Sequence, residues 1–280
     1  MLILILLLNH LIADFVLQSR KIAEKKEKFF KIAIYHALVH FVVAVVLLLI
    51  CYLFTYNRSL LSFQIFIAIA LVSIFHFLID TYGKKLFNKL LNNNDFFVFL
   101  VDQFLHLIII FVIVFLLVPN YNFDNIFNSI FVINIINKTF FIIFLVSIIF
   151  ILLTTFTGHM IAKLFKSLSH ENRIDNSEEV KVVERTTNDR LEVITEKIKF
   201  PVEVNDYGKW IGYCERIIIF LLVIIQVYEG IAIIVALKTF ARYQQLNQKN
   251  FVEKYLLGTL FSVMMGVLLG FLFRSLNFIF

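Results

Sequence analysis

Residues 34–54 read IYHALVHFVVAVVLLLICYLF, an apolar run that carries two histidines four residues apart. A helix needs about 20 apolar residues to cross the hydrocarbon core of a bilayer, and this run is long enough. Similar runs lie at residues 61–82, 97–118, 139–164, 211–237 and 255–274. A shorter apolar run covers residues 1–17. Because it lacks the basic start and cleavage site of a signal peptide, we expect it to be a retained helix that is tilted or only partly spanning.

The composition also indicates a membrane protein. Of the 280 residues, 60% are hydrophobic and 16% are charged, whereas a soluble domain has about 45–50% and 25%. Cys51 and Cys214 lie far apart in apolar runs, which excludes a disulfide framework or a zinc ribbon. We therefore predict an all-α, polytopic membrane protein with six to eight membrane segments. Its net charge of +6 is explained by topology, so we expect no nucleic-acid partner.

The acidic residues divide the chain into three regions. Residues 167–206 hold ten of the 20 Asp and Glu residues. We expect membrane helices over 1–166, a small acidic insert over 167–206, and further membrane helices over 207–280. Within the insert, the pattern around residues 187–190 suits a β-hairpin, and a short helix over 189–199 is the alternative. No internal repeat of fixed period is apparent.

Lysine and arginine in the short loops predict the orientation. The loops 20–31 and 83–95 are rich in these residues and should be cytoplasmic, which places the N-terminus outside and the insert 167–206 in the cytoplasm. A single crossing by residues 211–237 would place the basic loop 238–254 outside, against this rule. A re-entrant hairpin that turns near residues 226–230 would resolve the conflict, and both readings stay open.

Ionisable residues within the first four apolar runs occur in pairs. Each pair is spaced i, i+4, so both side chains lie on one face of a helix. The pairs are His10 and Asp14, His36 and His40, His76 and Asp80, and Asp102 and His106. All eight residues flank the two basic loops, within about 20 Å of the same membrane boundary at 1.5 Å per residue. They should therefore form one layer in the bundle.

Five imidazoles and three carboxylates suit a divalent metal. Zinc is the first choice, with manganese or iron(II) as alternatives. The expected ligands are His36, His40, His76 and His106, and Asp80 and Asp102 would complete or bridge the site. Asp14 is the expected general base, with the second catalytic candidate His10 beside it. A proton relay and purely structural polar contacts are the alternatives.

Other polar residues have weaker expected roles. Gln18 and Gln103 could orient a ligand, and His159 could join the layer or lie at the interface. In the C-terminal third, Arg216, Lys238 and Arg242 could form a basic pocket for a lipid headgroup or phosphate. An interfacial salt bridge is the alternative.

Residues 10–18, HLIADFVLQ, followed by His36-x-x-x-His40, resemble the start of a bacterial membrane family, domain of unknown function 3307. Residues 208–216, 238–242 and 253–262 resemble its C-terminal half, whereas the insert 168–204 is least similar. The resemblance implies a bacterial inner-membrane location. The His/Asp helices are more loosely similar to inner-membrane proteins described as metal-dependent hydrolases.

These observations predict a metal-dependent hydrolase with a cytoplasm-facing site and a membrane-associated or amphipathic substrate. A metal or proton transporter or sensor is the alternative, as is a non-enzymatic subunit whose acidic insert docks a cytoplasmic protein. Membrane lipid is the other expected partner. Polar residues cluster near one membrane face only, which favours a one-sided site over a transport path.

Overall fold

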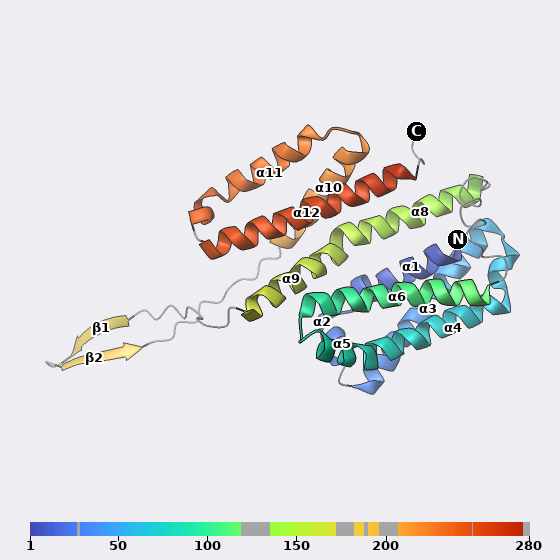
Figure 1. Cartoon of the computed structure of the whole chain (residues 1–280), viewed down its shortest axis with the longest axis horizontal. Helices are drawn as coiled ribbons and strands as arrows, with labels where there is room; N and C mark the ends of the chain where they lie inside the picture. The colour runs from blue at the N-terminus through green and yellow to red at the C-terminus, as the bar shows by residue number, and fades with distance from the viewer. Residues whose placement is uncertain are drawn as a thin grey trace.

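The computed structural model describes residues 1–26, 29–118, 135–171, 182–187, 190–195, 207–247 and 249–276. These residues are almost entirely helical, and the long helices lie side by side (Figure 1). Five helical stretches are long and apolar enough to cross a membrane: Phe30–Thr55, Phe63–Leu90, Asp95–Leu117, Lys138–Leu168 and Phe251–Ser275. Leu2–Leu17 is a shorter apolar helix. The predicted all-α membrane fold is therefore confirmed.

The N-terminal half contains two similar helical units. The first consists of α1 (Leu2–Ile12), the π-helical segment η1 (Ala13–Leu17), α2 (Arg20–Lys25) and α3 (Phe30–Thr55). A 3-10 turn, η2 (Arg58–Leu61), leads to the second unit. That unit consists of α4 (Phe63–Leu78), the π-helical segment η3 (Ile79–Gly83), α5 (Lys84–Leu90) and α6 (Asp95–Leu117). The short helices α2 and α5 lie at the same end of the bundle (Figure 1).

We call the two units repeats because they have the same order of elements, a relation that the search for a repeat of fixed period in the sequence did not find. The π-helical segments start at Ala13 in the first unit and at Ile79 in the second. The interval between these two positions also separates the members of four pairs of polar residues: His10 and His76, Asp14 and Asp80, His36 and Asp102, and His40 and His106. Few other residues separated by this interval are identical, so in the sequence only the polar residues indicate the repeat.

The second half of the chain packs beside the repeats. Helix α8 (Ile135–Ile151) continues through η4 (Leu152–Phe156) into α9 (Thr157–Glu171). Helices α10 (Tyr207–Ile224) and α12 (Lys249–Ser275) pack closely together, because a Cβ on Gly270 would lie 2.7 Å from Val223 Cβ. The short elements α11 (Glu229–Ala241) and η5 (Tyr243–Asn247) connect them.

Residues 211–237 do not form one continuous helix. Helix α10 ends at Ile224 and α11 begins at Glu229, and between them Gln226 adopts a left-handed conformation with φ of 63°. This turn lies where a hairpin was expected. Helix α11 has 13 residues and is about 20 Å long, which is too short to cross a bilayer. Whether the hairpin re-enters a membrane stays a prediction.

The acidic insert contains one described structural unit. Strands β1 (Val182–Thr187) and β2 (Arg190–Thr195) pair antiparallel, with Thr187 opposite Arg190 and Val182 opposite Thr195. This is the β-hairpin that the alternating pattern favoured over a helix. The rest of the insert, apart from the end of α9, lies outside the described residues.

The predicted orientation can be tested by labelling. Lys166 near the end of α9 pairs with Asp95 at the start of α6, 2.9 Å apart, so the chain enters the insert beside the second basic loop. Single cysteines in place of Lys31 and Thr186 should therefore react with an impermeant thiol reagent from the same side of a sealed vesicle. A cysteine in place of Asn57, in the opposite loop, should react only from the other side. If positions 31 and 186 were labelled from opposite sides, the predicted orientation would be wrong. The polar pairs would then not lie at one common depth in the membrane.

Candidate metal centre

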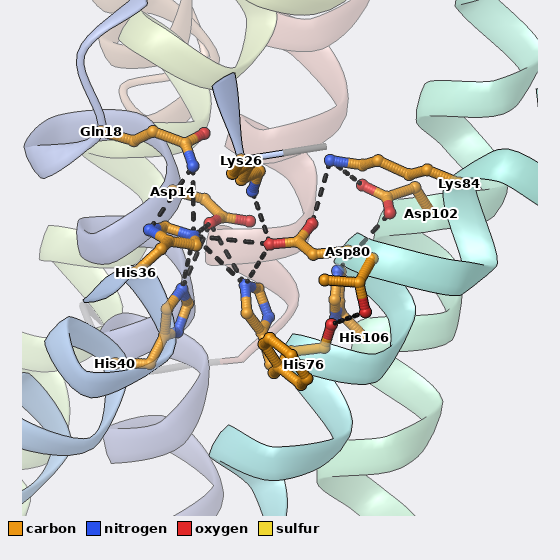
Figure 2. A network of polar contacts seen from close by, with 12 residues as sticks. Asp14, Gln18, Lys26, His36, His40, His76, Asp80, Lys84, Asp102 and His106 are labelled. Atoms are coloured by element: carbon orange, nitrogen blue, oxygen red, sulfur yellow. Dashed lines mark hydrogen bonds and ion pairs between the residues drawn. The ribbon is translucent and has the colours of Figure 1, made fainter. Parts of the chain in front are cut away.

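All eight paired residues meet in one buried layer between α1, α3, α4 and α6. None of them is more than 9% exposed. Figure 2 shows the cluster, in which side chains from both repeats point toward a common centre. The aspartates of the two His-x-x-x-Asp pairs each lie in a π-helical segment, η1 or η3. Such segments are frequent at functional sites because they locally rearrange the helical turn.

Four of these side chains bring one ligand atom each close together. Asp14 Oδ1 lies 2.8 Å from His36 Nε2, 3.2 Å from His40 Nε2 and 3.6 Å from His76 Nε2. His36 Nε2 lies 3.2 Å from His40 Nε2 and 3.3 Å from His76 Nε2. A tetrahedral zinc ion with bonds of about 2.0–2.1 Å has its ligand atoms about 3.3 Å apart. Five of the six distances between these four atoms, 2.8–3.6 Å, are therefore near those between the ligand atoms of a tetrahedral zinc site.

The cluster brings together more imidazole nitrogens than N–H···N bonds can use, although His36 and His40 can donate to Asp14 and His76 can donate to Asp80. Three imidazole nitrogens face one another, and an N–H···N bond can satisfy only one pair at a time because a neutral imidazole has one donor and one acceptor. A cation at the centre would accept all three nitrogen lone pairs and the carboxylate oxygen together. The residues present thus fit a divalent metal, in agreement with the prediction that this layer could bind one.

Two lysines complete the cluster, and the sequence analysis missed both. Lys26 Nζ lies 2.6 Å from Asp80 Oδ2, and the Lys26 side chain is buried. Lys84 Nζ lies 3.0 Å from Asp80 Oδ1 and 3.7 Å from Asp102 Oδ2. Lys84 could have been found by its i, i+4 spacing from Asp80, which continues the pattern of the pairs. Lys26 gives no such signal, because it stands in a loop with five other basic residues.

The opposite edge of the layer is also polar, but some of its buried polar atoms lack hydrogen-bond partners. His10 Nε2 lies 3.1 Å from Gln103 Oε1, and Gln103 donates to Asp102 Oδ2 at 3.1 Å. His106 Nε2 lies 3.6 Å from Asp102 Oδ1, and neither atom has a hydrogen-bond partner. A cavity of about one water molecule lies between the rings of His10, His40, His76 and His106. This edge can therefore accept a further small polar group.

The remaining polar candidates lie at the edge of the layer or outside it. Gln18 Nε2 lies 3.1 Å from His36 Nε2, so Gln18 and Gln103 both contact the layer as the sequence suggested. His159 is exposed, and its Nδ1 lies 2.8 Å from the Thr155 carbonyl oxygen, so it does not join the layer.

The C-terminal basic residues have separate partners. Arg216 is buried and donates to the carbonyl oxygens of Leu153 and Thr154 in η4. Lys238 pairs with Glu215, and Arg242 donates to Gln245 at 3.0 Å. The structure therefore does not gather the three cations into one pocket, because the Arg216 side chain turns inward toward α8 and α9. The described salt bridge joins Lys238 to Glu215, and a lipid or phosphate site at these residues stays a prediction.

Fold and site together define a helical membrane-type protein with a buried His/Asp/Lys cluster that could hold a divalent metal. Residues 2–134 match a family model described as "Protein of unknown function (DUF3307)". The family predicted from residues 10–18 and His36-x-x-x-His40 is thus confirmed over these residues, which include both repeats and the whole cluster. No curated protein and no solved structure matches the chain. The similarity of the C-terminal third to this family and the looser similarity to hydrolases stay predictions.

Proposed function

We propose that the protein is a membrane-embedded hydrolase that depends on one divalent metal ion, with zinc the first choice. The observation that carries this proposal is the close approach of Asp14 Oδ1 to the Nε2 atoms of His36, His40 and His76, and of His36 Nε2 to the other two, at 2.8–3.6 Å. A divalent ion bound there would lower the pKa of a bound water and polarise a scissile carbonyl or phosphoryl group.

The geometry revises the roles proposed from sequence. Asp14 was the expected general base, yet its Oδ1 lies at ligand distance from all three imidazoles, so we assign it as the fourth ligand. Asp80 Oδ2 lies 3.2 Å from His76 Nε2 and 3.7 Å from His36 Nε2, beside the four proposed ligands. We therefore assign Asp80 as the general base, and Lys26 holds it in place. Asp102 and His106 lie farther along the layer and bridge nothing in this arrangement.

The charges of the cluster also suit one divalent ion. With neutral imidazoles, three aspartates and two lysines give a net charge of −1, and a divalent ion brings it to +1. Either value is small for a buried site, where an unbalanced charge is costly. A second divalent ion would raise the charge to +3 unless a lysine lost its proton.

The residues around the cluster favour a reaction at one membrane face over transport of an ion across the membrane. Beyond the layer, away from α2 and α5, the core contains apolar side chains such as Leu6, Leu48 and Ile69. In the described parts of α1, α3, α4 and α6, no side chain of His, Asp, Glu, Lys or Arg is buried on that side. An ion that crosses the membrane needs polar groups along its whole path.

Activity should be measured with model substrates in detergent and in vesicles. Purified protein with zinc should release p-nitrophenolate from p-nitrophenyl acetate or from bis(p-nitrophenyl) phosphate, and a chelator should abolish the release. Asp14→Asn should lower metal affinity, because the amide is a weaker ligand than the carboxylate. Zinc flux into vesicles without release of product from either ester would contradict the hydrolase and favour a transporter.

A further inference from the structure

The two repeats supply equivalent polar positions, but they differ in residue type at His36 and Asp102 and at one further pair. Gln18 in the first repeat corresponds to Lys84 in the second, at the same interval that relates Asp14 to Asp80. Gln18 Nε2 lies 3.1 Å from His36 Nε2. Lys84 instead lies between two carboxylates, at 3.0 Å from Asp80 and 3.7 Å from Asp102 (Figure 2).

The second repeat nevertheless has the donor atoms of a cation site. Asp80, Asp102 and His106 each offer one ligand atom, and these atoms lie within 4.8 Å of one another. All three residues are buried. Asp102 Oδ1 and His106 Nε2 have no hydrogen-bond partner, although buried polar atoms nearly always have one. Metal-ligating atoms are therefore present here that make no hydrogen bond within the protein.

Lys84 explains why Asp80, Asp102 and His106 can remain buried together without a bound metal ion. Two buried carboxylates that share a site repel each other unless a cation lies between them. The ammonium group is a compact point charge on a flexible stem, and the Lys84 side chain is only 17% exposed. It supplies one positive charge where a divalent ion would supply two.

We propose that Lys84 takes the place of a second metal ion, so that the protein has two equivalent cation sites of which the second is closed by its own lysine. The inference rests on the proposed metal site in the first repeat. It assigns Asp80, Asp102 and His106 as a latent divalent-cation site that opens when the ammonium is removed. It also predicts that the natural protein binds one ion per chain.

The test counts zinc per chain by mass spectrometry after saturation and removal of excess metal. The wild type should bind one ion, and K84Q, which introduces the side chain found at position 18, should bind two. K85Q is the matched control, since Lys85 is the exposed neighbour of Lys84, and it should bind one. Purification of K84Q with zinc present supplies the replacing cation during folding.

The reciprocal variant gives an independent result if K84Q does not fold. Q18K places an ammonium beside Asp14 and His36 in the first repeat and should reduce the count from one ion to none. Two ions in the wild type, one ion in folded K84Q, or one ion kept by Q18K would each overturn the inference while leaving the first metal site intact. A wild type without any bound zinc would instead refute the proposed function itself.

Discussion

Replacing His40 with alanine should reduce bound zinc from one ion per chain to almost none. His40 Nε2 lies 3.2 Å from both Asp14 Oδ1 and His36 Nε2, so the change removes one of the four proposed ligand atoms. Loss of an outer partner of a metal ligand already costs about 10–100-fold in affinity, and we expect the loss of a ligand to cost more than about 100-fold. Isothermal titration with zinc measures the affinity directly.

The control for this variant is His159→Ala. His159 is exposed and lies outside the layer, with its Nδ1 at the Thr155 carbonyl oxygen. This change should leave zinc binding as in the wild type. Equal affinities of wild type and His40→Ala would show that the converging imidazoles are structural and do not bind metal.

Of the variants described here, Asp80→Ala should cause the largest decrease in the free energy of unfolding. The change leaves the buried ammonium of Lys26 without its carboxylate at 2.6 Å and removes the nearer partner of Lys84. Removal of one partner from a buried ion pair costs about 3–5 kcal/mol. Thermal unfolding in detergent, followed by circular dichroism, should show the lower midpoint.

Two further variants separate the stabilising role of the Lys26–Asp80 ion pair from the proposed role of Asp80 as the general base. Asp95→Ala removes a more exposed carboxylate that pairs with Lys163 and Lys166, and it should cost no more than about 1 kcal/mol. The double change Lys26→Met/Asp80→Asn removes both charges of the buried pair, so it should recover part of the lost stability but not the hydrolysis. Full ester hydrolysis by this double variant would exclude Asp80 as the base.

The sequence analysis predicted most of the architecture because membrane helices can be recognised from local sequence. A run such as residues 34–54 must satisfy its backbone internally and bury no charge, so length and composition suffice to recognise it. The spacing of His36 and His40, or of His76 and Asp80, likewise requires only helical periodicity. The family could be recognised from residues 10–18 for the same reason, since the motif is continuous in the chain.

The internal repeat could not be recognised in this way. The two units have related polar residues at equivalent positions, but few of the apolar residues between them are identical. Lipid-facing and core-facing positions accept many apolar side chains of similar size. The helix, π-helical segment, short helix and long helix recur in both units, and only this recurrence makes the equivalence of Gln18 and Lys84 visible.

By itself, the sequence determined the helices, their polar faces and the common depth of the eight paired residues. The tertiary structure decided which atoms meet: it gathered Asp14 with three imidazoles, and it directed Lys26 and Lys84 onto Asp80. It also turned Arg216 inward, away from Lys238 and Arg242. The reason is physical: periodicity fixes the face on which a side chain lies, whereas its partner depends on how neighbouring helices pack and on where buried charges find compensation.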